Sequence, residues 1–490
     1  MEQEEKSTVR TLLLFIGGLT ALWTLQCALL QNILGYDILE AIVWGEQLAL
    51  GHAKHPPFSG WVAFAFSKLS GHADWSMYLL AQLCIGCGVW FVYKTARLFY
   101  GCREAAVSAL LLYFVYYYNP SEIKFSTYYC ELALFPAAAF CFFSALEKKK
   151  IIYWCLFGLL CGLCVLNKYS CGLYFIALGA VLLSSRSYRS CLRSAGPYIA
   201  VLLGIAAASP HLVWLYRHDW VCFSHVHSRM TDEHQWYMPL CVLGIMLYPF
   251  GAEALALILT AVFGRKELRK RPARKTLFAR FAAMTAIPGL ILLAMSLAGS
   301  DVILMWLCSF FPWTGAALVA VYPWEITAKS FRAVCALLLI YTGCFFIGST
   351  LDLALNPRTK IHTDPQSIVK PALEFWHRHR KDEIPVVVGG LWLGATVENY
   401  SASRPPLCEI EDDVFYERYR KTIDEKGALL IGSKTGEFDD FIRRTGYKQL
   451  KFTPVHYWYS TVCGRRDDNV FLLAYYPPRV EREAEANSKP

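Results

Sequence analysis

The chain has 490 residues, of which 55% are hydrophobic, 15% aromatic and 18% charged, and it carries a formal net charge of +9. Its mean hydropathy of +0.33, together with repeated apolar runs near the ~20 residues that cross a bilayer, excludes a water-soluble globular protein and indicates a polytopic membrane protein. The basic residues lie in short clusters between the apolar runs, without a basic face or an aromatic platform, so we expect no nucleic-acid partner.

About eleven apolar segments are predicted to cross the membrane as helices. They cover residues 11–30, 75–93, 105–118, 128–146, 151–166, 171–183, 197–215, 238–263, 277–297, 302–321 and 331–355. The first segment lacks a small-residue cleavage site, so it is interpreted as a retained anchor. Together these segments define a predicted membrane domain over residues 1–357.

Positive charges occupy alternate connections between the segments, which is typical of cytoplasmic loops. Lys148–Lys150 and the run from Arg265 to Lys275 are two of these clusters. We therefore expect the protein to lie in the inner (plasma) membrane of a bacterium with its N-terminus in the cytoplasm. Because the number of predicted spans is odd, the C-terminus is then exported. The connections then predicted to face outward are 37–57, 119–127, 167–170, 216–236 and 300–301.

The connection after the first segment carries ionisable residues that an ordinary loop would not need, among them Asp37 and Glu40. A carboxylate beside low-dielectric lipid can have its pKa raised towards working pH, which favours Asp37 as a catalytic base. Glu40 lies three positions on, would share a helical face with Asp37, and could bind an acceptor or substitute as the base. The alternative is that both are solvated loop carboxylates.

Lys54 and His55 precede Pro56–Pro57, a pair that stiffens the backbone and stops a helix. A rigid loop can hold a cation in place, so Lys54 is predicted to contact a phosphate and His55 an acceptor or headgroup. In the alternative interpretation, Lys54 only extends to the lipid headgroups.

Polar residues of later connections are expected on the same outer surface. Lys168 runs against the positive-inside bias, which favours a functional cation, and Glu131 is an acid near the outward end of its segment. His211, Arg217 and His225 lie in or beside the connection before residue 238. The histidines there form no recognised closed metal site, so we predict headgroup or acceptor contacts and assign neither a metal nor another cofactor, although a divalent ion stays possible.

After Pro357 the composition changes to that of a water-soluble domain. Residues 385–390, 428–432 and 470–475 are predicted strands, and residues 371–381 and 437–445 are predicted helices. This pattern predicts a small exported α/β domain over residues 358–480, followed by a disordered charged tail at 481–490.

Four separated blocks of the first half resemble a known family. The sequence resembles the bacterial membrane glycosyltransferases related to protein O-mannosyltransferases and the lipid A aminoarabinose transferase, which are grouped as glycosyltransferase family 39. The similarity is weaker beyond Arg265. The blocks are Tyr36–Asp37 with Trp44, Leu50–Gly51 and Lys54–Phe58; Ile123–Phe125; Leu166–Tyr169; and Ser209–Trp214 with Arg217–Asp219.

This resemblance implies the C-type glycosyltransferase fold, with about eleven spans, outward catalytic loops and a polyprenyl-phosphate sugar as donor. The family's first-loop aspartate corresponds to Asp37, and its lysine in the Lys-Tyr block corresponds to Lys168, near the donor phosphate. Many relatives place a second aspartate in the outward loop before the fourth span. Here either Glu131 takes that role, or Asp37 and Glu40 do all the acid work.

The expected function is transfer of a sugar from a polyprenyl-phosphate donor to a lipid, glycan or protein acceptor at the outer face of the inner membrane. The catalytic acids would be Asp37 and Glu40, with Lys54, Lys168 and Arg217 at the donor phosphate. Acceptor or headgroup contacts would come from His55, Glu131, His211 and His225. The alternatives are a transporter or flippase, which predicts paired broken helices and charges near the bilayer midplane, and a receptor whose exported domain binds a partner.

Overall fold

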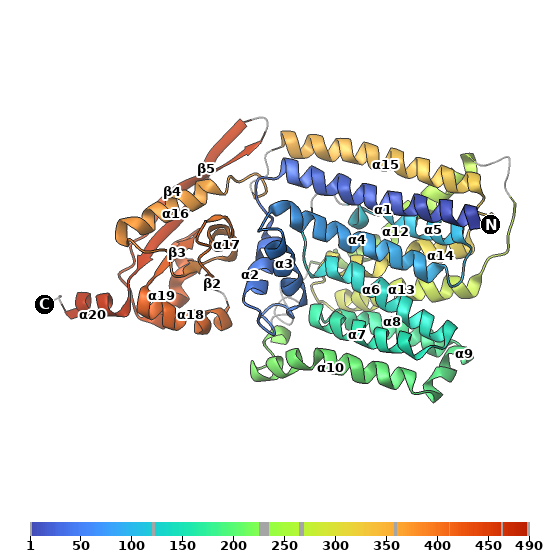
Figure 1. Ribbon diagram of the computed structural model, residues 1–490, viewed down its shortest axis with the longest axis horizontal. Coiled ribbons are helices and arrows are strands. Elements are labelled where there is room, and N and C mark those ends of the chain that lie inside the picture. Colours follow the sequence, from blue (N-terminus) through green and yellow to red (C-terminus); the bar gives the residue numbers. More distant parts are fainter. Residues whose placement is uncertain are drawn as a thin grey trace.

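The computed structural model describes residues 2–119, 123–224, 235–263, 269–356, 360–410, 412–461 and 464–487. It consists of a helical membrane domain and a C-terminal α/β domain that docks on one end of the helices, opposite the N-terminus (Figure 1). This arrangement agrees with the predicted fold class, a polytopic α-helical membrane protein with a small C-terminal α/β domain.

Eight helical segments among the described residues are long and apolar enough to cross a membrane, and a ninth results if the bent pair α8 (Cys171–Ser184) and α9 (Arg186–Arg189) counts as one span. The shorter apolar helix α7 (Ile151–Asn167) lies beside them. The eight are α1 (Glu2–Leu30), α4 (Asp74–Ala96), α6 (Thr127–Lys148), α10 (Gly196–Arg217), α12 (Met238–Phe263), α13 (Lys275–Leu297), η5 with α14 (Leu304–Trp313 and Thr314–Val321) and α15 (Ala328–Leu355).

By this measure the count is lower than the expected eleven, partly because the apolar run 105–118 is not one regular α-helix. Helix α5 (Cys102–Leu110) continues directly into the 3-10 turn η1 (Leu111–Phe114), and η2 (Tyr116–Tyr118) follows. The run still extends along α1, because Cys102 Sγ lies 3.9 Å from the Glu5 carbonyl and the Asn119 side chain accepts a hydrogen bond from the Trp23 indole N–H. Most of its side chains are buried inside the helical domain.

The connection after α1 contains two short helices, α2 (Tyr36–Glu46) and α3 (Phe58–Leu69), at the end of the membrane domain that faces the α/β domain (Figure 1). They pack closely because glycines meet at their contact: a Cβ on Gly45 would overlap the backbone of Gly60. Helix α2 places Asp37 and Glu40 one turn apart, as the sequence predicts.

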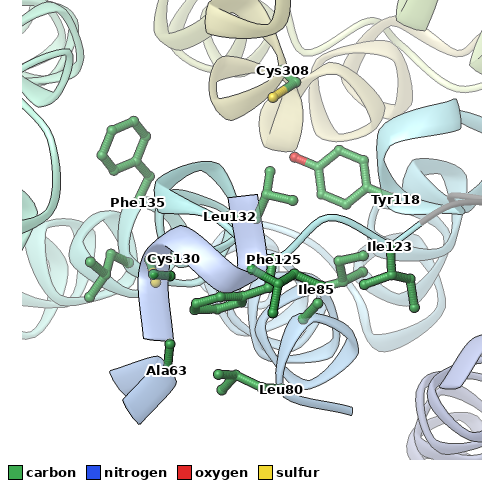
Figure 2. Packing of buried hydrophobic residues seen from close by; sticks show 14 of the residues in the cluster. Ala63, Leu80, Ile85, Tyr118, Ile123, Phe125, Cys130, Leu132, Phe135 and Cys308 are labelled. Carbon is green, nitrogen blue, oxygen red and sulfur yellow. The ribbon is translucent and has the colours of Figure 1, made fainter. Parts of the chain in front are cut away.

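Beneath these two helices lies a closely packed core. Ala63 of α3 and Leu80 of α4 face Phe125 and Leu132, which come from the start of the α6 region (Figure 2). Helices α4 and α6 approach so closely at Gly88 that a Cβ there would overlap the Leu132 carbonyl. Small residues that allow such backbone contact replace the hydrophobic driving force that is missing between helices in lipid.

The α/β domain contains one five-stranded sheet in the order β2-β1-β3-β5-β4. Strands β1 (Val387–Gly389), β2 (Leu407–Glu409) and β3 (Ala428–Gly432) are parallel, whereas β4 (Thr453–Thr461) and β5 (Gly464–Tyr476) are antiparallel. The three predicted strands coincide with β1, β3 and β5. The helices are α16 (Gln366–His379), α17 (Leu391–Tyr400), α18 (Asp413–Lys426), α19 (Asp439–Thr445) and α20 (Arg479–Asn487).

Helix α20 corrects one expectation, because residues 481–487 of the tail that was predicted to be disordered are helical. Arg482 anchors this helix through an ion pair with Asp424 of α18 at 2.7 Å, and Arg479 pairs with Glu483 one turn on at 2.7 Å. The high charge of the tail therefore reflects a solvated helix face.

Hydrogen bonds join the α/β domain to the membrane domain just after α1. The Tyr400 hydroxyl donates to Asp74 Oδ2 at 2.8 Å and accepts from the Leu34 backbone N–H at 2.8 Å. The Asn32 amide donates to the Ser460 carbonyl at 3.0 Å. Several separate contacts thus fix how the domain sits over α2.

Candidate functional site

The centre of the candidate site is a half-buried cation between two carboxylates, at the boundary of the two domains. Lys54 Nζ lies 3.0 Å from Glu40 Oε1 and 3.1 Å from Glu409 Oε1. The Lys54 side chain is 22% exposed, that of Glu40 12% and that of Glu409 2%. The ammonium also lies 5.9 Å from the ring centroid of Trp44. The α/β domain thus contributes one of the two acids that hold the lysine.

Local backbone signals place these groups. Glu40 faces the loop from α2, which begins after the extended Gly35. Lys54 lies in the non-helical stretch that Pro56 and Pro57 close before α3 begins. Glu409 is the last residue of β2, and ligand-contacting groups commonly follow the carboxyl ends of parallel strands.

Burial and charge determine the protonation of this trio. Burial raises the pKa of Glu40 to about 7, against the opposing effect of Lys54 and with smaller contributions from Glu409 and Asp37. Burial also raises the pKa of Glu409. Burial alone would lower the pKa of Lys54, but Glu40 and Glu409 outweigh it and raise that pKa above its ordinary value. Lys54 therefore stays charged, while the Glu40 carboxyl group exchanges its proton near neutral pH.

The loop that carries Lys54 is anchored by the far end of α10. His211 Nδ1 donates to the Leu50 carbonyl at 2.7 Å, so its Nε2 accepts from the Tyr169 hydroxyl at 2.6 Å. A Cβ on Gly51 would overlap the indole ring of Trp214. These contacts bring the Leu50–Gly51 and Ser209–Trp214 blocks together in space, and they use both ring nitrogens of His211, whose predicted headgroup contact is untested.

A second cation, which is buried, lies on the helical side. The Lys168 ammonium forms no hydrogen bond with any described residue. Its Nζ lies 3.5 Å from the ring centroid of Tyr128 and 5.9 Å from that of Trp306. Burial lowers the pKa of Lys168, whereas the charge of Glu131 favours its protonated form. An unpaired ammonium in such surroundings is costly unless an anion accompanies it.

Glu131 is buried and fully engaged. Its two carboxylate oxygens accept hydrogen bonds from the hydroxyl groups of Ser170 and Ser309. The residue therefore joins α6, the start of α8 and η5, close to Lys168. The side chain is only 1% exposed, and its direct contact with an acceptor stays a prediction.

Asp37 lies between the two cations. Its half-buried carboxylate is close enough for its charge to act on Glu40 of the same helix and on the Tyr128 phenol that packs against Lys168. The lysines and Asp37 thus lie at the same end of the membrane domain. The roles assigned to them stay predictions.

The remaining predicted residues are less central. His55 packs edge-on against Trp44 with ring centroids 5.9 Å apart. Arg217 is exposed at the end of α10 and forms no ion pair with a described residue. His225 lies outside the described residues. Across the described ranges, no three His, Cys, Asp or Glu side chains are grouped so that they could hold a metal ion.

Sequence reasoning missed Glu409 and assigned no role to His52. His52 is 1% exposed and stacks on Trp44 with centroids 5.0 Å apart, and burial lowers its pKa to about 3, so it is a neutral part of the loop's packing. The one available signal for Glu409 was an acid inside the otherwise apolar Leu407–Ile410 stretch.

Comparisons with known proteins identify the fold. The structure superimposes on ArnT from Cupriavidus metallidurans bound to undecaprenyl phosphate with a TM-score of 0.58 and 15% identity, covering 94% of this chain and 97% of ArnT. The apo form of ArnT gives a TM-score of 0.55 and 14% identity over 96% of this chain and 98% of ArnT. The chain has the C-type glycosyltransferase fold.

Two sequence comparisons each match a part of the chain. Residues 54–214 match the family described as dolichyl-phosphate-mannose-protein mannosyltransferase. Over 187 residues the chain is 28% identical to the lipid A galacturonosyltransferase RgtD of Rhizobium johnstonii. That alignment covers 38% of this chain and 39% of RgtD, so it spans about two fifths of the relative's length. The predicted resemblance is confirmed.

Proposed function

We propose that this protein is a membrane glycosyltransferase that moves a sugar from a polyprenyl-phosphate donor to a lipid, glycan or protein acceptor at the outer face of a bacterial inner membrane. The observation that carries the proposal is the buried Lys168 ammonium without a hydrogen-bond partner among the described residues. A phosphate is an anion that satisfies such a cation, and ArnT, which has the same fold, was crystallised with undecaprenyl phosphate.

In the proposed reaction the acceptor hydroxyl attacks the anomeric carbon of the donor sugar. The bond between that carbon and the phosphate oxygen breaks, and the phosphate leaves with the electron pair. Because the hydroxyl attacks from the side opposite the phosphate, the configuration of the anomeric carbon is inverted. Lys54 and Lys168 stabilise the charge that develops on the phosphate. Asp37 takes the acceptor proton, and Glu40, whose pKa lies at about 7, can replace it as the base.

The other predicted residues would lie around the reacting groups and assist binding. Arg217 is exposed at the outer end of α10, where it can meet a lipid phosphate. His55 and His225 would contact the acceptor or a headgroup. Glu131 would keep Lys168 charged, and His211 would hold the loop that carries Lys54. The N-terminus would then be cytoplasmic and the α/β domain exported.

The test uses a deletion strain and mass spectrometry of its lipid and glycan fractions. The deletion should lose one glycosylated product, and wild-type protein should restore it. We expect Asp37→Asn to lower product formation by about 100-fold or more, since general-base groups contribute on that scale. Asp440→Asn, an exposed acid of α19, is the matched control and should restore the product. Full restoration by Asp37→Asn would refute Asp37 as the base.

The transporter or flippase alternative is not favoured. It predicts paired broken helices and charges near the bilayer midplane. The buried Glu253 of α12 accepts a hydrogen bond from the Thr314 hydroxyl at 3.0 Å, which assigns one of its oxygens to helix packing.

A further inference from the structure

The α/β domain reaches into the candidate site through one side chain. Glu409, at the carboxyl end of β2, is 2% exposed and lies 3.1 Å from Lys54 Nζ. Its neighbour Asp412 accepts a weaker hydrogen bond from the Ala53 N–H at 3.4 Å. The domain therefore adds buried negative charge at the cation that is proposed to bind the donor.

A lysine ammonium has three N–H donors. Glu40 and Glu409 take two of those on Lys54. That leaves one Lys54 N–H donor for a phosphate, and a carboxylate that gives way adds a second. Glu40 belongs to the same short helix as Asp37, whereas Glu409 comes from another domain, and its displacement leaves the first loop intact.

The docking of the domain does not depend on Glu409. Tyr400 binds Asp74 and the Leu34 N–H, and Asn32 binds the Ser460 carbonyl. The Glu409 side chain can therefore release Lys54 while the domain stays in place.

The negative charge around Lys54 strengthens the competition between the Glu409 carboxylate and the donor phosphate. The acids that face Lys54 or its neighbours are Asp37, Glu40, Glu409 and Asp412, and the Tyr36 phenol also acts on Lys54. The added charge of a phosphate is unfavourable beside ionised carboxylates at such short range.

On the basis of the proposed function, we propose that Glu409 is a positioning residue that holds Lys54 and competes with the donor phosphate for its ammonium. The α/β domain thereby sets the affinity of the site for polyprenyl phosphate. Because protonation removes the competing charge, donor binding takes up a proton.

The experiment measures binding of undecaprenyl phosphate to the full-length protein in lipid nanodiscs. At about pH 8, Glu409→Gln should bind about tenfold more tightly than wild type, because a charge is lost while the side-chain shape is kept. At about pH 6 the difference should be smaller, because burial raises the pKa of Glu409 and protonation removes the charge that the variant lacks. Free undecaprenyl phosphate also titrates in this range, and it does so identically in the experiments with the two proteins.

Glu374→Gln, an exposed acid on α16 of the same domain, is the matched control and should bind as wild type does. Equal or weaker binding by Glu409→Gln at the higher pH would overturn the proposal, and so would the same gain in Glu374→Gln. If Glu409→Gln does not fold, Glu409→Asp withdraws the carboxylate and should still strengthen binding. Failure of wild type to bind undecaprenyl phosphate would instead refute the proposed donor.

Discussion

The two ends of the membrane domain use charge in opposite ways. At the end near the N-terminus, Arg97 pairs with Glu5 at 2.6 Å, Arg274 pairs with Glu104 at 3.0 Å, and Arg271 also pairs with Glu104. Each of these arginines has a carboxylate partner. At the other end, one lysine is held by two acids and Lys168 has no hydrogen-bond partner among the described residues.

This difference distinguishes charged residues that hold the fold together from charged residues that are available to a substrate. Matched pairs fix how helices and loops meet and leave nothing for a ligand. An excess of acid around one ammonium, and a second ammonium in an aromatic pocket, cost folding free energy. Such groups are expected where a charged substrate binds.

The largest effect is expected at Lys54. Lys54→Ala removes the cation that Glu40 and Glu409 share, and activity should fall by about 1,000-fold, the upper range for loss of one charge-stabilising group. The measurement is the rate of sugar transfer by the purified protein. Lys68→Ala, an exposed lysine of α3, is the control. A Lys54→Ala protein that keeps a tenth of wild-type activity would mean that the acid-rich end needs no cation there.

A smaller effect is expected from the loop that carries this lysine. Gly51→Ala would force a methyl group into the Trp214 ring and shift the loop. A displacement of about 1 Å can reduce catalysis by about 100-fold, so we expect a loss of 10- to 100-fold in the transfer rate. Gly172→Ala, where a Cβ meets no neighbour, is the control. Unchanged activity would show that the loop tolerates movement.

The sequence predicts much of this molecule, because helices, strands and the Asp37–Glu40 spacing are local patterns. The change from α-helix to 3-10 turns inside the apolar run 105–118 was not predicted, since apolarity alone does not distinguish a regular helix from an irregular packed segment. Glu409 could not be predicted, because it lies 355 positions from Lys54 and meets it only through domain docking. Nothing in the local sequence encodes that contact.

A pH-dependent change in stability should distinguish the two ends. The folded-state pKa of Glu40 lies at about 7, above its ordinary 4.5, so folding favours the protonated form. Its contribution is fully present below about pH 4.5 and is lost as pH rises through about 7, costing about 3 kcal/mol of stability. Thermal unfolding followed by intrinsic fluorescence measures how stability falls with pH, and this fall should be smaller in Glu40→Gln than in wild type. An identical slope in variant and wild type would contradict the shift.

The smallest effect on activity is expected at the matched end. Glu104→Gln leaves Arg271 and Arg274 without their charge partner, in a region where the Arg271 side chain is only 8% exposed. We expect a loss of about 1–2 kcal/mol in stability, because the remaining amide still accepts a hydrogen bond and the arginine also donates to the Tyr322 carbonyl. Transfer by the folded fraction should stay within about twofold of wild type, since no step of the proposed reaction involves this end. A variant that unfolds no more readily but transfers sugar tenfold more slowly would show that the two ends are coupled.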